Sequence, residues 1–276
     1  MIGLFKIIKS FIKKESLQEI FKESGIKALD IAFKSKSGHL GGSLSLIQAL
    51  SYYLYNLKKN SSNWKIILSK GHSSLGLYSL LETLKIEDNL TNRYCLIPGG
   101  FHGHTCSKAS KLILASTGSL GHGLPIAAGH AYAAKKNNYD LKTICIIGDG
   151  DMQEGSNLEI LHSLLKLKDC NLKIINDDNS SVDSKFVNSG NFFLNLKKNY
   201  IGLDIIKSFD MEFWSEQKNF FKWISMPGLK IANCKTIKGF GFKEMYNNPK
   251  WHAGIPNNEE YKKFLSAANF SLKDEK

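Results

Sequence analysis

The chain has few cysteines, and none of them stands in a Cys-x-x-Cys pair. Zinc ribbons and dithiol redox motifs use that spacing, so the main sequence signal for either is absent. Two of the five cysteines, Cys145 and Cys234, lie in segments with the composition of strands. We therefore expect reduced, mainly structural thiols and a cytoplasmic protein.

The sequence also has no sign of a membrane span at its start. Residues 1–14 are basic and apolar at near-helical spacing, but lysines interrupt the apolar residues and no small-residue cleavage site follows. A spanning helix needs about 20 apolar residues, so this segment is far too short. It could touch a membrane surface. The favoured interpretation is an N-terminal extension, residues 1–14, that lies on its own protein.

No stretch rich in proline, glycine or serine divides the 276 residues, of which 42% are hydrophobic. Strand-like and helix-like segments alternate, which predicts one α/β domain over residues 15–276, with a mostly parallel sheet and helices on both faces. Strands are expected at residues 65–69, 143–147, 172–176, 203–209 and 229–235. Helices are expected near residues 16–34, 43–57, 73–86, 121–136 and 156–168. In the last helix, Leu158, Leu161 and Leu165 should form one buried stripe, and residues 180–200 should form a long loop over a ligand crevice.

The formal net charge of +12 is spread along the chain. Nucleic-acid-binding proteins usually cluster Lys and Arg on one face or one helix, whereas these lysines are scattered among Asn and Ile. We therefore expect no nucleic-acid partner. The positive field would still favour small anionic ligands.

Two of the expected strands end on side chains with hard oxygen atoms. Gly148-Asp149-Gly150 follows one apolar run, and Asp177-Asp178-Asn179 follows the next. Ligands of open parallel sheets bind beyond the carboxyl ends of the strands, so these two ends should face one crevice. The carboxylate of Asp149 and the amide carbonyl of Asn179 suit Mg²⁺ that takes its other oxygens from phosphate. The sequence therefore predicts a cofactor made of a metal ion and a diphosphate.

Four histidines lie next to or near glycine in expected loops: His39, His72, His104 and His252. Glycine lets the backbone approach a ligand closely, and imidazole moves protons near neutral pH and hydrogen-bonds hydroxyl groups. Together they indicate chemistry on a polyol. Zinc is the alternative, but no pair has the i, i+4 spacing of a zinc-peptidase helix, and Cys106 is an isolated thiol. Since His102 and His104 alternate, at most one of them should face the crevice.

A glycine-rich turn, residues 116–125, leads into the helix expected at 121–136. Such a turn exposes backbone N–H groups to anions, and Pro125 is tolerated in the first turn of a helix. On its own this turn is weak evidence for a ligand site.

In this order, the motifs resemble the N-terminal, diphosphate-binding part of transketolase over about residues 17–262. The matching stretches are Ser37–Ser43, Leu68–His72, Gly103-His104, Thr117–Gly123, Gly148–Gly155, Asp177–Asn179, Thr236–Gly241 and Asn247–His252. The resemblance implies a thiamine diphosphate-binding α/β fold. It also implies transfer of a two-carbon ketol unit from a ketose phosphate to an aldose phosphate. Thiamine diphosphate would supply the electron sink, and histidines would move the protons.

The resemblance assigns roles to individual residues. Asp149, the side chain of Asn179 and the backbone carbonyl of Ser181 match the Mg²⁺ ligands. Positions that line or touch thiamine diphosphate are matched by Gly118, Ser119, Leu120, Gly150, His72 and His252. His39 and His104 match histidines that bind the sugar and move its protons, and His72 and His252 also match contacts to substrate. Glu154 matches a carboxylate near the cofactor and the subunit interface, where a like-charged neighbour could raise its proton affinity.

Transketolases are more than twice as long as this chain. Their pyrimidine-binding and C-terminal domains, with the glutamate that activates the cofactor, have no counterpart in the sequence. The resemblance therefore implies one subunit of a split transketolase that is inactive without a second polypeptide carrying those domains. A dimer of heterodimers is the expected assembly.

Departures from the family pattern, such as His122 and Phe240, leave the identity of the sugars open. A specialised transketolase-like enzyme of a biosynthetic pathway is one alternative. A cofactor-binding scaffold subunit without turnover is another. The related deoxyxylulose phosphate synthases match less well at Leu68–His72 and at Trp251-His252.

Overall fold

The computed structural model describes residues 12–60, 63–95, 100–166, 170–182, 185–186, 192–193, 195–196, 198, 204–246 and 248–275. Most of the expected N-terminal extension, residues 1–14, lies outside the described residues, as does most of the loop expected at residues 180–200. Among the helices that are described, none is both long enough and apolar enough to cross a membrane.

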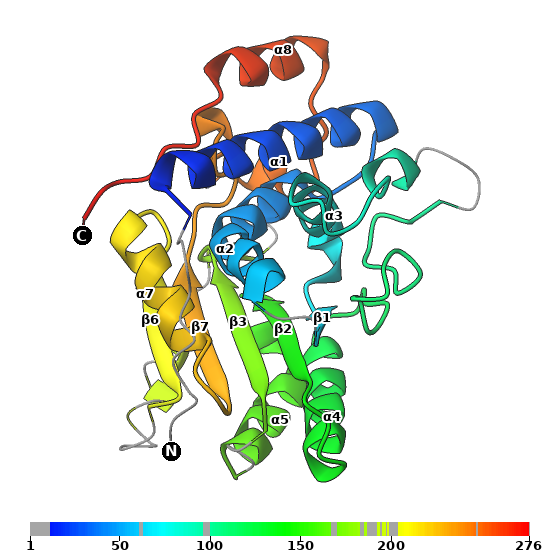
Figure 1. Cartoon of the computed structure of the whole chain (residues 1–276). Coiled ribbons are helices and arrows are strands. Elements are labelled where there is room, and N and C mark those ends of the chain that lie inside the picture. The colour runs from blue at the N-terminus through cyan, green and yellow to red at the C-terminus, as the bar shows by residue number, and fades with distance from the viewer. Residues whose placement is uncertain are drawn as a thin grey trace.

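Five parallel strands form the central sheet in the order β1-β2-β3-β7-β6 (Figure 1). They are β1 (Trp64–Leu68), β2 (Lys142–Gly148), β3 (Leu172–Asp178), β6 (Ile206–Asp210) and β7 (Lys230–Lys235). A short antiparallel ribbon, β4 (Ser181–Val182) and β5 (Lys185–Phe186), follows β3. Each expected strand is present with somewhat different ends, and the predicted parallel α/β fold is confirmed.

Helices pack on both faces of the sheet because strand side chains alternate between two apolar clusters. On β2, Ile144 and Ile146 belong to one cluster, and Cys145 and Ile147 to the other. The first cluster draws on α1 (Lys14–Ser35), α2 (Leu40–Asn60), α3 (Ser74–Thr83) and α7 (Trp214–Ile224). The second draws on α4 (Gly123–Lys136) and α5 (Gly155–Lys166). This is the arrangement of helices on two faces that the sequence predicted.

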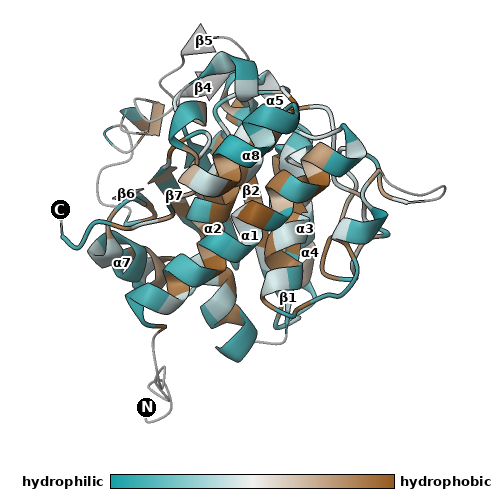
Figure 2. Ribbon diagram, turned by 90° about the horizontal axis from the view of Figure 1, so that it is seen from above, coloured by the Kyte–Doolittle hydropathy of each residue, from teal (hydrophilic) through white to brown (hydrophobic). Residues whose placement is uncertain are grey.

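The outermost helix, α8 (Asn258–Ala267), lies beside α1 on the far side of that helix from the sheet (Figure 1). Seen from above, α1 and α8 each carry both hydrophilic and hydrophobic residues, as expected of helices with one buried side (Figure 2). The buried side of α1 includes Leu17, Phe21 and Ala28. Helices α1 and α8 therefore close one end of the first apolar cluster.

Two helices, α7 and α8, were absent from the sequence expectations. For α8 a local signal existed, because Asn257 and Glu260 form a capping box in which each side chain accepts from the other residue's backbone N–H. One detail of α5 was wrong. Leu161 and Leu165 are buried, but Leu158 is 39% exposed, so burial on that face begins one turn later than expected.

Candidate functional site

The ends of β2 and β3 bring the two predicted metal ligands together. Gly148 pairs with Asp177 in the parallel register, and Asp149 and Asn179 follow these positions. The backbone N–H of Asn179 donates to Oδ2 of Asp149 over 3.0 Å. Both side chains are buried, with exposures of 3% for Asp149 and 6% for Asn179. The sequence argument from neighbouring strand ends therefore holds in the structure.

A cavity of about 150 Å³ opens at this edge of the sheet. Its walls come from the start of α2, the loops after β1, β2 and β3, and two later loops: Gly42, Lys70, His72, Leu120, Gly148, Asp149, Gly150, Asp151, Asn179, Lys238 and His252. Six predicted site residues line it: His72, Leu120, Asp149, Gly150, Asn179 and His252. The cavity thus lies beyond the carboxyl ends of the strands, where open parallel sheets bind ligands.

The four loop histidines lie close together, and two of them, His72 and His252, line the cavity. The ring centroid of His39 lies 5.2 Å from that of His72, 5.8 Å from that of His104 and 5.4 Å from that of His252. His72 and His252 are 5.6 Å apart. His39 precedes Leu40, the first residue of α2, which begins three residues earlier than expected. His102 is exposed and makes none of these ring contacts, in agreement with the predicted alternation.

Backbone contacts between loops explain this convergence. Thr105 N donates to Gly71 O over 3.0 Å, and Thr117 N donates to Thr105 O over 3.1 Å. These bonds join the loops of His72 and His104 to the glycine-rich turn. A methyl group on Gly41 would lie 2.7 Å from the carbonyl oxygen of Trp251, so only glycine allows the start of α2 to approach the loop of His252 this closely.

Two of the four histidines, His39 and His72, sit in an environment that favours the neutral imidazole. Burial lowers the pKa of His39, and the nearby His104 and Lys238 lower it further. Burial also lowers the pKa of His72 well below its usual range, with Lys70 as the next largest cause. Near neutral pH both rings are therefore uncharged and able to accept a proton from a hydroxyl group.

Lys238 is a site residue that the sequence argument did not single out. It is 2% exposed, and its Nζ lies 3.1 Å from Nδ1 of His252. Because an ammonium group can only donate, Nδ1 accepts and the ring proton of neutral His252 belongs on Nε2. The motif Thr236–Gly241 marked this segment, but nothing local to it indicates that Lys238 reaches His252.

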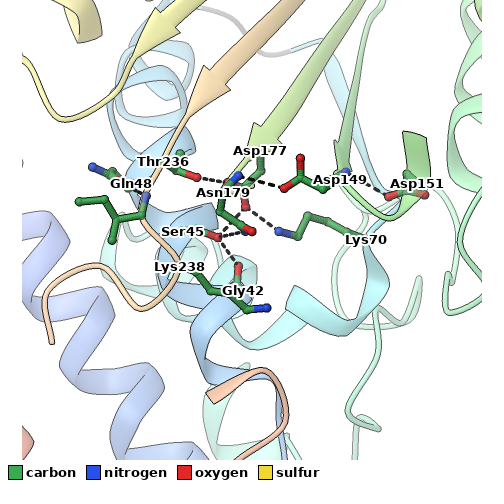
Figure 3. A network of polar contacts seen from close by, with 12 residues as sticks. Gly42, Ser45, Gln48, Lys70, Asp149, Asp151, Asp177, Asn179, Thr236 and Lys238 are labelled. Carbon is green, nitrogen blue, oxygen red and sulfur yellow. Dashed lines mark hydrogen bonds and ion pairs between the residues drawn. The ribbon is translucent and has the colours of Figure 1, made fainter. Parts of the chain in front are cut away.

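A buried polar network lies beneath the cavity floor (Figure 3). Asp177 accepts hydrogen bonds from Ser45 Oγ at 2.8 Å, Lys70 Nζ at 2.6 Å and Thr236 Oγ1 at 2.5 Å. Ser45 in turn accepts from Nδ2 of Asn179 at 3.0 Å. Lys70 and Asp177 stand in the quoted strand-end motifs without an assigned role, whereas Ser45 has no local signal at all.

Asp151 is the second acidic residue that the sequence argument missed. Its carboxylate accepts from Ser69 Oγ at 2.6 Å, Gly121 N at 3.0 Å and Gly148 N at 3.1 Å. Burial raises the pKa of Asp151, although these hydrogen bonds act in the opposite direction. Asp151 thereby ties the loop after β2 to the loop after β1 and to the glycine-rich turn.

Gly118, Ser119 and Glu154 are not among the described residues that line the cavity. Gly118, Ser119 and Glu154 are exposed, and Ser181 begins β4. Glu154 packs against the turn at Gly121, whose φ is +81° and where a methyl group would lie 2.6 Å from Glu154 Cβ. The roles assigned to these four residues remain predictions. Within the described part of the chain, no group of three or more His, Cys, Asp or Glu residues is placed to hold a metal ion.

The cavity contains one feature that fits a hard cation. Oδ1 of Asn179 is buried and has no hydrogen-bond partner among the residues that the structure describes, while its Nδ2 donates to Ser45. A buried amide oxygen without a partner costs free energy unless a ligand satisfies it. With Asp149 beside it, this oxygen supplies the donor type that Mg²⁺ prefers. The residues present therefore fit a metal–diphosphate group.

The fold and the site together define an open parallel α/β protein with a cavity at the carboxyl ends of its strands that is lined in part by Asp, Asn, Lys and His residues. The family model described as the transketolase, thiamine diphosphate binding domain matches residues 17–264. The chain therefore belongs to this family.

Two similar proteins are each named as one subunit of an apulose-4-phosphate transketolase. The one from Actinobacillus succinogenes is 31% identical over 256 residues, which cover 86% of this chain and 88% of that protein. The one from Phocaeicola vulgatus is 28% identical over 269 residues, covering 90% of this chain and 92% of that protein.

Solved transketolases share the fold. The structure from Campylobacter jejuni has a TM-score of 0.71 at 25% identity and covers 94% of this chain. A Pichia stipitis structure has a TM-score of 0.74 at 20% identity and the same coverage. This chain spans only 44% and 41% of those two proteins.

Proposed function

We propose that this chain is the thiamine diphosphate-binding subunit of a two-subunit transketolase, which moves a two-carbon ketol group between sugar phosphates. The single observation that carries the proposal is the buried pair of Asp149 and Asn179, with its unpartnered amide oxygen, beside a cluster of histidines. Asp149, Asn179 and the carbonyl of Ser181 would hold Mg²⁺. The diphosphate would fill the remaining positions around the ion.

The cofactor, when bound, supplies an electron sink for the ketol carbon. The chain would bind and orient it through the turn at Gly118, Ser119 and Leu120 and through Gly150 and Glu154. His39 and His104 would take a proton from a sugar hydroxyl and return one to the acceptor. His72 and His252 would contact both cofactor and sugar, and Lys238 would keep the proton of His252 on Nε2.

A second polypeptide would complete the active site. Support comes from the two relatives named as transketolase subunits, each covered to about nine-tenths of its length. We propose that the partner carries the pyrimidine-binding and C-terminal domains, that residues 15–276 act as one domain, and that the assembly is a dimer of heterodimers. The five cysteines are all free, which suits the reducing cytoplasm.

The sugars of a specialised pathway are a second candidate for the substrates. The names of three relatives support it: two are named for apulose-4-phosphate, and one from Clostridium is named as a 6-deoxy-6-sulfo-D-fructose transketolase subunit and is 32% identical over 130 residues. Proteins named simply transketolase, such as that of Mycoplasma pneumoniae at 25% identity, also match. The proposal therefore fixes the reaction class and leaves the donor and acceptor to experiment.

Reconstitution tests the proposal directly. The chain and its partner are mixed with Mg²⁺, thiamine diphosphate and a panel of ketose phosphate donors and aldose phosphate acceptors. The mixture should transfer the ketol unit, and either chain alone should not. Cofactor uptake by the assembled complex without transfer on any donor would instead indicate a scaffold role. Absence of cofactor uptake in the complex would refute the proposal.

A further inference from the structure

Beneath the cavity, one serine connects a buried carboxylate to the predicted metal-binding amide. We propose that Ser45 is a positioning residue that holds the Asn179 amide with its oxygen turned into the cavity, and that Asp177 fixes the direction of this hydrogen bond. The inference rests on the proposed function, because it concerns how this chain prepares its own site for the metal ion.

Apart from the Asn179 amide, the described polar atoms that hydrogen-bond with the Ser45 hydroxyl are both acceptors. Ser45 Oγ lies 2.8 Å from Oδ2 of Asp177 and 3.1 Å from the carbonyl oxygen of Gly42. A carboxylate and a carbonyl both accept and cannot donate. Whichever of the two takes the proton, the oxygen of Ser45 is left to act as an acceptor toward Asn179.

This one-way arrangement selects the orientation of the Asn179 amide. Its NH₂ group can donate to Ser45, as it does over 3.0 Å. If the amide turned over, its oxygen would face the oxygen of Ser45, and the Ser45 hydroxyl could donate to it only by giving up its bonds to Asp177 and Gly42. Turning it would also bury the NH₂ group against the cation site. Ser45 thus favours the orientation in which Oδ1 is the buried atom without a partner among the described residues.

Two further donors hold the carboxylate of Asp177 in place. Lys70 donates to the same Oδ2 at 2.6 Å, and Thr236 donates to Oδ1 at 2.5 Å. Asp177 is fully buried and Lys70 is 3% exposed. These donors come from the loops after β1 and β7, so three separate segments position the carboxylate. Groups that orient metal ligands in this way commonly change metal affinity by about 10–100-fold when they are removed.

The neighbouring residue on β3, Asp178, shows that a carboxylate at the strand end is not enough to connect to Ser45 and Asn179. Asp178 accepts from Nδ2 of Asn233 at 2.8 Å and from Ser180 Oγ at 3.4 Å. Its side chain points to the other face of the sheet because strand residues alternate. The route from Asp177 through Ser45 to Asn179 is therefore specific to one face.

The test compares Ser45→Ala with Ser51→Ala in the complex with the partner chain. Ser51 is a matched control: it is buried on the same helix, and its hydroxyl donates only to the Ile47 carbonyl at 2.7 Å. Calorimetric titration with Mg²⁺ at saturating thiamine diphosphate gives the metal affinity without relying on turnover. Mn²⁺ uptake followed by electron paramagnetic resonance gives a second, spectroscopic readout.

Ser45→Ala should bind Mg²⁺ about 10–100-fold more weakly than the wild type, and Ser51→Ala should stay within about 3-fold. Ser45→Thr, which keeps the hydroxyl group, should restore most of the affinity. If Ser45→Ala does not fold, Ser45→Cys tests the same step, since a thiol of similar size is a poor acceptor. Equal affinities in the Ser45 and Ser51 variants would overturn the inference alone. A wild-type complex that takes up no thiamine diphosphate would overturn the proposed function, and the inference with it.

Discussion

Replacing Lys70 with methionine removes the positive charge from the most deeply buried ion pair of the described chain. Nζ of Lys70 lies 2.6 Å from Oδ2 of Asp177, with side-chain exposures of 3% and 0%. Breaking such a pair costs about 3–5 kcal/mol, because the remaining charge stays buried. Asp177 keeps its hydrogen bonds from Ser45 and Thr236, so we expect a loss near the lower limit, about 3 kcal/mol.

Guanidinium unfolding of the cofactor-free chain measures this loss. In a domain of this size, about 3 kcal/mol corresponds to a decrease in Tm of about 6–12 °C. The matched control is Lys263→Met, which removes an exposed partner of Glu244 at 3.5 Å, with exposures of 65% and 33%. That change should cost less than about 1 kcal/mol. A loss in Lys70→Met no larger than in Lys263→Met would refute the reasoning about the buried pair.

The same variant has an electrostatic consequence in the histidine cluster. After burial, the charge of Lys70 is the largest cause that lowers the pKa of His72. Lys70→Met should therefore raise the pKa of His72, and Lys263→Met should leave it unchanged. An NMR titration of the histidine ring protons checks this shift. An unaltered His72 titration in Lys70→Met would show that the charge of Lys70 does not contribute to the pKa shift.

Three further predictions concern stability. Gly121→Ala should destabilise the chain by about 1–3 kcal/mol, because φ is +81° and the added methyl group would lie 2.6 Å from Glu154 Cβ. The control Gly129→Ala, in α4, adds a methyl group with no atom within 4 Å and should instead stabilise the chain by about 0.5–1 kcal/mol. Similar changes in stability for the two variants in urea unfolding would contradict this prediction. The pKa of His72 is lower in the folded state than in the unfolded state, so the unfolded state takes up more protons below pH 6.5 and wild-type stability should fall on acidification. His72→Gln should lose part of this pH dependence. Parallel curves of unfolding free energy against pH for the wild type and His72→Gln would count against the prediction. Burial lowers the pKa of Lys173 to about 7, so the unfolded state holds more protons between pH 7 and about 10. As the pH increases over this range, the wild type should become more stable relative to Lys173→Met. A difference in unfolding free energy between the two proteins that does not change with pH would exclude the lowered pKa of Lys173.

The strand ends were the part of the site that the sequence could predict. Asp149 and Asn179 stand in the short segments that follow two apolar runs, and general rules for parallel sheets place such ends at one crevice. The loop histidines could be grouped in the same way, through their glycine neighbours. For these residues the chemistry is local in sequence, and the fold only has to bring a few marked segments together.

The supporting residues could not be found in this way. Ser45 lies in an ordinary apolar helix, and it meets Asp177, 132 positions later, only because α2 packs across the sheet. Lys238 reaches His252 because the loop after β7 folds back against the start of α2, where Gly239 N donates to Gly41 O over 3.1 Å. Contacts of this kind depend on how the helices and loops pack against the sheet, and they cannot be predicted from the spacing of residues in the sequence.

The short polar run at the end of β3 contributes side chains both to the candidate site and to the contact between β3 and β7. Asp177 and Asn179 share one side of the strand and form the network with Ser45. Asn176 and Asp178 share the other side, where Asn176 donates to Asn233 at 2.7 Å and Asn233 donates to Asp178 at 2.8 Å. A shift of one residue would exchange the two sets and turn the metal-binding amide away from the cavity. The Asn233 bridge on β7 therefore helps to fix the register on which the orientation of Asn179 depends.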